Sequence, residues 1–224
     1  MAQHFDLEEQ EQLDQLKHFW NKWGTPITGA LIVVFGSFAA WNGYQYWQAR
    51  QATQAAALAD AVTQAVEGQQ LDRIGQALTD LKSGYASTHQ AAQSGLLAAK
   101  AYADAGQWDQ ARDALAWVAD KGSDNGLQSL ARLRLAAVLL EQKQPDAALQ
   151  QLSAAFPAEF TAVAADRRGD AYALQDKKAE AVAEYEKAYK AFDSQVDYRR
   201  LVEFKLNALG VQVQAQASPT EAKL

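Results

Sequence analysis

Carboxylates and histidines are the residues from which catalysis in this chain would have to be built. Asp166 and Asp170 stand four residues apart in a helical pattern, so they share one helix face, where mutual repulsion could raise the pKa of one for acid–base chemistry. A hydrolase that uses this pair is one hypothesis. Such pairs are far more often solvated or partner-binding faces, so we predict that the chain is not an enzyme.

Other chemistry finds little support in the residue types. The chain has no cysteine, which excludes thiolate metal sites, disulfides and a cysteine nucleophile. His4, His18 and His89 form no pair at the three- or four-residue spacing by which one helix presents two metal ligands, and no glycine-rich phosphate loop is present. We therefore expect no cofactor and no metal. A net charge of −6 argues against nucleic-acid binding, which needs a concentrated basic face.

A membrane-spanning helix is the most distinctive element of the N-terminal region. No formal charge occurs between Lys22 and Arg50, and about 20 apolar residues suffice to cross a bilayer, so residues 24–47 are predicted to span it. Aromatic residues flank both ends of the run, as they do at lipid headgroups. The residues expected to hold the chain in lipid are Trp23, Ile27, Phe35, Phe38, Trp41 and Trp47.

Three interpretations of this helix remain open: an uncleaved anchor, a removable signal peptide, and a buried core helix, whose apolar run is usually only about 10–14 residues long. Ser37-Phe38-Ala39 resembles a cleavage site, but the region before it is long and acidic, whereas a signal peptide begins short and basic. We favour the anchor. The small excess of positive charge at Lys17 and Lys22 over Arg50 predicts a cytoplasmic N-terminus and a C-terminal domain on the other side.

Residues 1–23 form a short leader before the span. Leu16, Phe19 and Trp23 follow helical spacing among acidic and amide residues, which is consistent with an amphipathic helix that lies on the membrane or binds a cytoplasmic partner. A polar leader without a partner is the alternative.

The region after Arg50 contains an internal repeat. Ala111, Ala148 and Ala181 lie 37 and 33 residues apart within similar patterns, and Gly169-x-x-Tyr172 precedes the last of them. Small residues at these positions let two helices approach closely. This pattern resembles the tetratricopeptide repeat, a pair of antiparallel helices that stacks on its neighbours.

The fold class that follows is all-α, with a transmembrane helix and then a tetratricopeptide-like α-solenoid that ends in a capping helix. We expect a long helix from Pro26 to Glu67 and a shorter one over 71–85. The helix pairs that follow are predicted over 89–105 and 108–120, over 127–142 and 146–155, and over 158–174 and 179–193, with a capping helix over 196–209. The predicted domains are the leader 1–23, the span 24–47, a divergent first pair within 48–88, repeats and capping helix 89–210, and a tail 211–224.

The first helices of such repeats line a concave groove that can hold a peptide or a partner helix. A leucine-rich centre indicates either a partner-binding channel or simple packing between neighbouring helices, and both remain open. The residues predicted to contact a partner are Lys100, Asp104, Leu133, Leu140, Asp166, Asp170 and Leu174.

The whole chain resembles the bacterial YfgM family, the ancillary subunit of the SecYEG translocon. The resemblance rests on HFWNKWG before the span, WNGYQYWQ after it, and a tetratricopeptide-like domain of this length. It implies a single-pass inner-membrane protein with a periplasmic repeat domain. It further implies association with the SecYEG channel and with the membrane-anchored periplasmic chaperone PpiD, and assistance to exported polypeptides.

These observations lead to one main hypothesis, a non-enzymatic, membrane-tethered adaptor for protein export with chaperone-like binding. The alternative is a cleaved, soluble periplasmic scaffold or envelope assembly factor.

Overall fold

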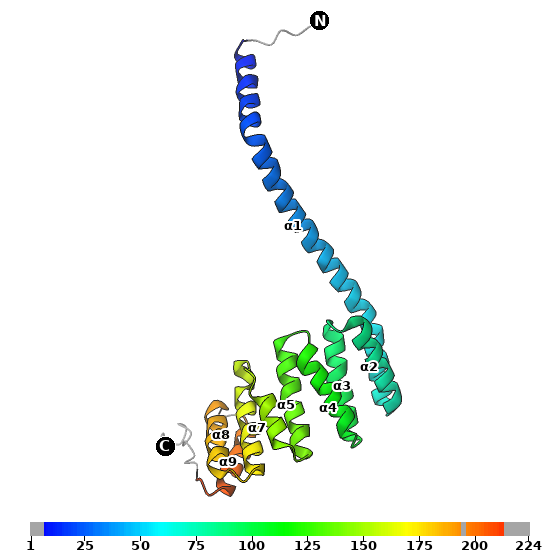
Figure 1. Ribbon diagram of the computed structural model, residues 1–224, viewed down its shortest axis with the longest axis vertical. Coiled ribbons are helices and arrows are strands. Elements are labelled where there is room, and N and C mark those ends of the chain that lie inside the picture. Colours follow the sequence, from blue (N-terminus) through cyan, green and yellow to red (C-terminus); the bar gives the residue numbers. More distant parts are fainter. Residues whose placement is uncertain (1–6, 194–195, 213–224) are drawn as a thin grey trace, which may run out of the picture. The chain divides into compact units, whose positions relative to one another are not determined.

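The computed structural model describes residues 7–193 and 196–212, and the regular structure in these ranges is entirely helical (Figure 1). It divides into two compact units, one ending at Gln51 and the other beginning at Ala52. The predicted all-α class is therefore confirmed. The predictions for residues 1–6 and for most of the tail, residues 213–224, concern residues outside those that the structure describes.

The first unit consists of the larger part of helix α1, Leu7–Glu67. The prediction that this helix begins at Pro26 is wrong, because α1 begins in the leader and Pro26 lies inside it. Leader residues after Leu7 are mostly strong helix formers, and no glycine or proline interrupts them before Gly24. The leader is therefore helical from Leu7 onward, and its binding to the membrane or to a partner stays a prediction.

The second unit is a series of helical hairpins that starts with the last turns of α1. Its remaining helices are α2 (Leu71–Tyr85), α3 (His89–Asp104), α4 (Trp108–Lys121), α5 (Asn125–Glu141), α6 (Pro145–Leu152), the 3-10 turn η1 (Ala158–Phe160), α7 (Thr161–Leu174), α8 (Lys178–Ala191) and α9 (Tyr198–Ala208). α6 ends three residues before the predicted position, and η1 replaces the predicted start of α7. Pro157 keeps the two helices separate, because proline disfavours helical backbone at Phe156 and has no N–H to donate.

Equivalent turns repeat along the second unit. Among the described residues, five have a positive φ, and they lie 37, 37, 33 and 34 residues apart. After each, the next N–H donates to the carbonyl five residues earlier, as Gln107 does to Tyr102 at 2.8 Å and Val211 does to Leu206 at 3.0 Å. This is the hydrogen bond that closes a helix with a left-handed residue. The five turn residues are Gln69, Gly106, Lys143, Asp176 and Gly210.

These turns show which helices are equivalent. α1, α3, α5, α7 and α9 each end in one, so each is the first helix of a repeat. The interpretation of residues 48–88 as a divergent first pair agrees with the turn at Gln69. Equivalent contacts also join successive repeats, because Gln142 donates to Asp109 at 3.4 Å and Gln175 donates to Asp146 at 2.7 Å.

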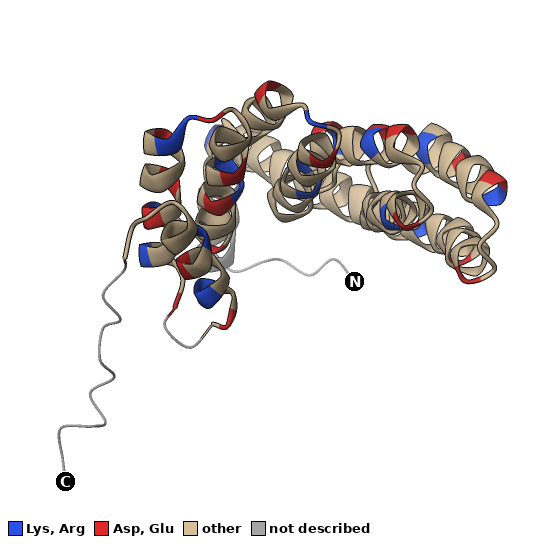
Figure 2. Ribbon diagram, turned by 90° about the horizontal axis from the view of Figure 1, so that it is seen from below, with Lys and Arg blue, Asp and Glu red and all other residues tan. Residues whose placement is uncertain are grey.

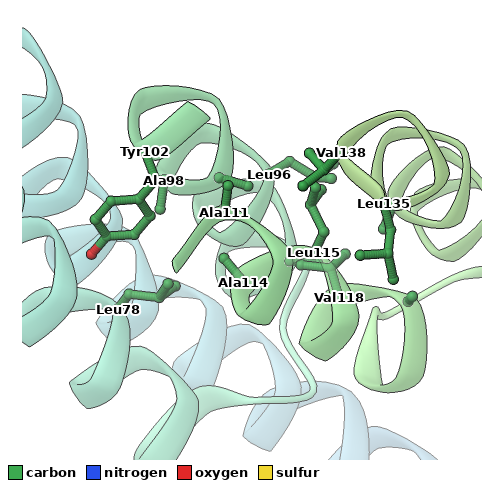
Figure 3. Packing of buried hydrophobic residues seen from close by; sticks show 14 of the residues in the cluster. Leu78, Leu96, Ala98, Tyr102, Ala111, Ala114, Leu115, Val118, Leu135 and Val138 are labelled. Atoms are coloured by element: carbon green, nitrogen blue, oxygen red, sulfur yellow. The ribbon is translucent and has the colours of Figure 1, made fainter. Parts of the chain in front are cut away.

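Small residues at the helix crossings hold the repeats together. Ala111, Ala148 and Ala181 are fully buried, as their predicted role requires. A Cβ atom at Gly169 would lie 2.5 Å from the ring of Tyr185 on α8, so only glycine allows this close approach. Figure 3 shows the interlocking of side chains around Tyr102, Ala111 and Leu115 in the larger core cluster, which extends from Ala55 to Ala164.

The α9 helix closes the solenoid. Its Val202 and Leu206 are fully buried in a second cluster with Tyr185 and Ala188 of α8. Arg200 and Asn207 remain exposed on another face. A helix that buries one side and presents polar residues on the end of the stack is what a capping helix requires, so that prediction is confirmed.

Candidate partner-binding site

A groove of about 680 Å³ lies among the first helices α1, α3 and α5 of the second unit. Its apolar surface comes from small and aliphatic side chains, and its polar groups are amides, hydroxyls and charged groups. The lining includes Ala59 and Asp60 of α1, Gln93, Leu97 and Lys100 of α3, and Leu130 and Arg134 of α5.

The turn residues define the register of this surface. The residues nine positions before each turn form one row, and the residues six positions before it form a second row. The nine-position row contains Asp60, Leu97, Arg134, Arg167 and Leu201, and the six-position row contains Thr63, Lys100, Ala137, Asp170 and Phe204. On α1 the residues of both rows, Asp60 and Thr63, line the groove, and on α3 Leu97 and Lys100 do so. On α5 only the residue of the nine-position row, Arg134, is part of the lining. We call these two sets the groove rows.

The charges of the groove are only partly neutralised. Lys100 forms an ion pair with Asp104 one turn later, and both side chains are exposed. Asp60 and Arg134 are exposed and have no ion-pair partner among the described residues. Figure 2 shows acidic and basic residues intermixed over the helices of this unit. The groove can therefore offer apolar contacts together with a free carboxylate and a free guanidinium.

The predicted leucine contacts divide between core and surface. Leu133 is only 5% exposed and fills the larger core cluster, so it presents no surface to a partner in this structure. Leu140 is half-buried against the same cluster. The packing interpretation therefore accounts for both residues. Leu174, at 37% exposure, is the one of the three that lies on the surface.

Asp166 and Asp170 are brought together, but inside a network of side chains from α7, α8 and α9. The Nζ atom of Lys205 lies 2.7 Å from Asp166 Oδ1 and 2.6 Å from Asp170 Oδ1. Tyr198 donates its hydroxyl to Asp166 and Tyr185 donates to Asp170, each at 2.8 Å. Asp166 has no exposed surface, so it is not available to a partner.

The pKa values of both tyrosine hydroxyls in this network are raised. Burial raises the pKa of the Tyr198 hydroxyl to about 12, and the neighbouring Asp166 carboxylate adds to the effect. Burial, with Asp170 as its second cause, also raises the pKa of Tyr185. Both hydroxyls therefore remain protonated donors. The network fastens α9 to the preceding repeat, and its carboxylates are occupied as acceptors instead of being open to a substrate.

A second ionic cluster joins α7 to α8. Arg168 donates to Glu184 at 2.8 Å and also to the carbonyl of Leu152 at 3.0 Å, and Lys187 pairs with the same carboxylate. Burial raises the pKa of Glu184, but the hydrogen bonds from Lys187 and Arg168 outweigh it and lower the pKa. This cluster joins the two helices of one repeat and, through the carbonyl of Leu152, connects them to the preceding repeat.

The first unit presents its apolar side chains to the outside. Among the described residues, α1 is the one helix long and apolar enough to cross a membrane, and only 6% of its most apolar window is buried. A core helix of a soluble protein would be mostly buried. The predicted anchor residues Phe35, Phe38 and Trp41 are each more than 60% exposed, Trp23 and Trp47 about half, while Ile27 is partly covered.

Several surface residues were not among those predicted from the sequence to contact a partner. Asp60 and Arg134 line the groove, and Leu201 and Phe204 occupy the groove rows on α9. The signal that could have found them is the period of the helix-ending turns, which continues beyond the alanine repeat to Gln69 and Gly210. None of these four residues stands out by its residue type alone. In the described part of the chain, no group of three or more potential ligands could hold a metal ion.

Comparisons with known proteins agree with this architecture. Residues 17–211 match the family model of a tetratricopeptide repeat-like domain. A Neisseria gonorrhoeae protein named ancillary SecYEG translocon subunit is 36% identical over 93% of this chain and 100% of its own length. Proteins of the same name from Haemophilus influenzae and Escherichia coli are each 29% identical, over 92% and 91% of this chain and 99% and 97% of their own lengths. No solved structure gives a significant match.

The match extends over the leader, the apolar helix and the repeats, so it concerns the whole architecture and not the repeat alone. In the described residues a long apolar helix comes first in the chain and a helical-repeat domain follows it. Because the relatives match over this whole architecture, the chain belongs to the YfgM family of ancillary SecYEG translocon subunits.

Proposed function

We propose that this chain is a non-enzymatic, membrane-tethered subunit that works beside the SecYEG channel and binds other polypeptides through its repeat groove. One observation carries the proposal: the groove among α1, α3 and α5 is open, mixed in character, and lined by Asp60 and Arg134 without ion-pair partners. The names of the relatives supply the cellular setting.

The apolar part of α1 supports the tether. Its large side chains are exposed along the stretch that is free of formal charge, which suits contact with lipid tails. Tethering confines the groove near the membrane and raises its effective concentration there, so weak contacts suffice for binding. We place the N-terminus in the cytoplasm and the repeats in the periplasm, on the basis of Lys17 and Lys22.

The occupants that we propose are exported polypeptides and the membrane-anchored chaperone PpiD. A groove with both aliphatic and amide side chains, such as Leu97 and Gln93, can hold an apolar segment and hydrogen-bond to its backbone. A catalytic role finds no support in the Asp166–Asp170 pair, whose carboxylates are bonded to Lys205 and two tyrosines.

Site-specific photocrosslinking in native membranes tests this function. A photoreactive residue at Gln93 or Arg134 in the groove should capture SecYEG subunits, PpiD or a radiolabelled exported chain. The same residue at Asp113, an exposed position on the second helix α4, is the matched control. Capture from Asp113 and none from the groove positions contradicts the proposal.

The intact mass of the purified protein separates the tethered form from the soluble alternative. A chain that retains its apolar helix agrees with the tether, and a mature N-terminus at Ala40 establishes the cleaved scaffold instead.

A further inference from the structure

The nine-position row places opposite charges on the two sides of a leucine. Within the groove this row consists of Asp60 on α1, Leu97 on α3 and Arg134 on α5. Asp60 and Arg134 are exposed and have no ion-pair partner among the described residues, and Leu97 is partly buried against the core. A ligand that lies along the row therefore meets a carboxylate, then an apolar side chain, then a guanidinium.

The remaining charge of the groove lining does not disturb this order. Lys100 belongs to the six-position row and forms an ion pair with Asp104 of the same helix, so these two charges neutralise each other. The other polar residues of the lining carry amides and hydroxyls. Asp60 and Arg134 are therefore the charged groups of the lining that stay available to a ligand.

The spacing of the row matches one backbone conformation of a ligand. Packed helices lie about 8–10 Å apart, so successive members of the row are separated by about that distance. A polyproline II segment has three residues per turn and rises about 3.1 Å per residue, so every third side chain points the same way about 9 Å further along. A β-strand alternates its side chains with a period of two, which turns the third residue to the opposite face.

An unfolded polypeptide supplies this conformation readily. Polyproline II is a major conformer of unfolded chains, and its unpaired backbone groups can hydrogen-bond to groove amides such as Gln93. A helical ligand would reach across the row with residues seven apart, but an isolated helix of the roughly 15 residues needed is marginal in water. The row therefore suits an extended segment that has not yet folded.

We propose that the groove selects polyproline II segments in which a basic, an apolar and an acidic residue follow one another at intervals of three. The basic side chain pairs with Asp60, the apolar one packs on Leu97, and the acidic one pairs with Arg134. This inference rests on the proposed function, which it deepens by naming the class of segment that is held. The order of the two charges in the segment sets the direction in which it lies.

Fluorescein-labelled peptides with blocked ends test this selection by fluorescence anisotropy, with the full chain in mild nonionic detergent. The main probe is Lys-Pro-Pro-Leu-Pro-Pro-Glu, and two companions carry lysine or glutamate at both ends. At about 50 mM salt the main probe should bind about threefold more tightly than either companion, since each exposed ion pair contributes little. The preference should disappear near 500 mM salt, where exposed charges are screened.

A shortened probe, Lys-Pro-Leu-Pro-Glu, controls for net charge. It keeps both charges and the leucine but not the intervals of three, so it should bind about threefold more weakly than the main probe. Equal binding of the two probes at low salt would overturn the proposed spacing.

Charge reversal in the groove should redirect the selection. Arg134→Glu presents two carboxylates and should favour the probe with two lysines, and Asp60→Arg presents two guanidinium groups and should favour the probe with two glutamates. Arg73→Glu is the matched control, because Arg73 is exposed on α2, outside the groove lining, and the net charge changes equally. If Arg134→Glu and Arg73→Glu have the same preferences among the probes, the inference is wrong.

The crosslinking experiment separates a failure of this inference from a failure of the proposed function. If the probes bind without preference, or do not bind, while Gln93 or Arg134 positions still capture exported chains, the groove function stands and the selection is wrong. If the probes do not bind and the groove positions capture no polypeptide, both proposals are wrong.

Discussion

Gly169 of α7 and Tyr185 of α8 approach so closely that a Cβ atom at position 169 would lie 2.5 Å from the aromatic ring. This contact sets the distance between the two helices of the last complete repeat. It also places the Tyr185 hydroxyl 2.8 Å from Asp170, so the packing of one hairpin and the network beneath the capping helix depend on the same residue.

Gly169→Ala should therefore destabilise the repeat domain. The added methyl group overpacks the hairpin, which typically costs about 1–3 kcal/mol. Gly84→Ala is the control, because a Cβ there meets nothing within 4 Å and alanine favours helix. Urea unfolding followed by circular dichroism measures both. Equal stability of the two variants would show that the hairpin can widen without cost.

Lys205→Met should destabilise the chain more strongly than most surface changes. It leaves the fully buried Asp166 carboxylate without its cation, and breaking a buried pair from one side costs about 3–5 kcal/mol. Lys190→Met is the control, because its pair with Glu186 is exposed and worth at most about 1 kcal/mol. Thermal unfolding compares them, and adding Asp166→Asn to Lys205→Met should recover part of the loss.

Alkaline pH should weaken the attachment of α9. The folded pKa of Tyr198 is about 12, above the ordinary value of 10.0, so its contribution is complete below pH 10 and is lost as pH rises from 10 toward 12. Thermal unfolding between about pH 9 and 12, a range that covers both pKa values, should show a fall in stability that is smaller in Tyr198→Phe. An identical pH profile in the variant would mean that the pKa of the Tyr198 hydroxyl is not raised in the folded protein.

Acid should loosen the contact between α7 and α8. The pKa of Glu184 is lowered from 4.5, so its stabilising effect is present above that value and is lost as pH falls below it. Glu184→Gln should be less stable at neutral pH and should lose less stability on acidification. Urea midpoints at neutral pH and at about pH 3 measure the difference. If the variant loses as much stability on acidification as the original chain does, the assigned role of Arg168 and Lys187 is wrong.

The apolar region of α1 should resist extraction from membranes. Washing with alkaline carbonate should leave the full chain in the pellet, since about 20 apolar residues remain in the bilayer core. Replacing Phe35 and Phe38 with arginine should shift part of it to the supernatant. Complete release of the unmodified chain would show that no part of it spans the membrane.

Most of the fold could be predicted because it depends on local patterns. Apolar periodicity and alanine spacing predicted the hairpins to within a few residues, and the differences around Pro157 are at the end of α6 and the start of α7. The start of α1 was missed because Pro26 resembles a helix beginning, whereas the leader before it has nothing that ends a helix.

The sequence by itself determined the helices, their repeat and the apolar helix, since these follow from residue type and spacing along one segment. Only the tertiary structure decided that Leu133 and Asp166 are buried, that Lys205 bridges two carboxylates, and that Phe204 lies in the register of the groove. The physical reason is that side-chain exposure and ion pairing depend on helices that are 30 to 40 residues apart in the chain, as Lys205 and Asp166 are.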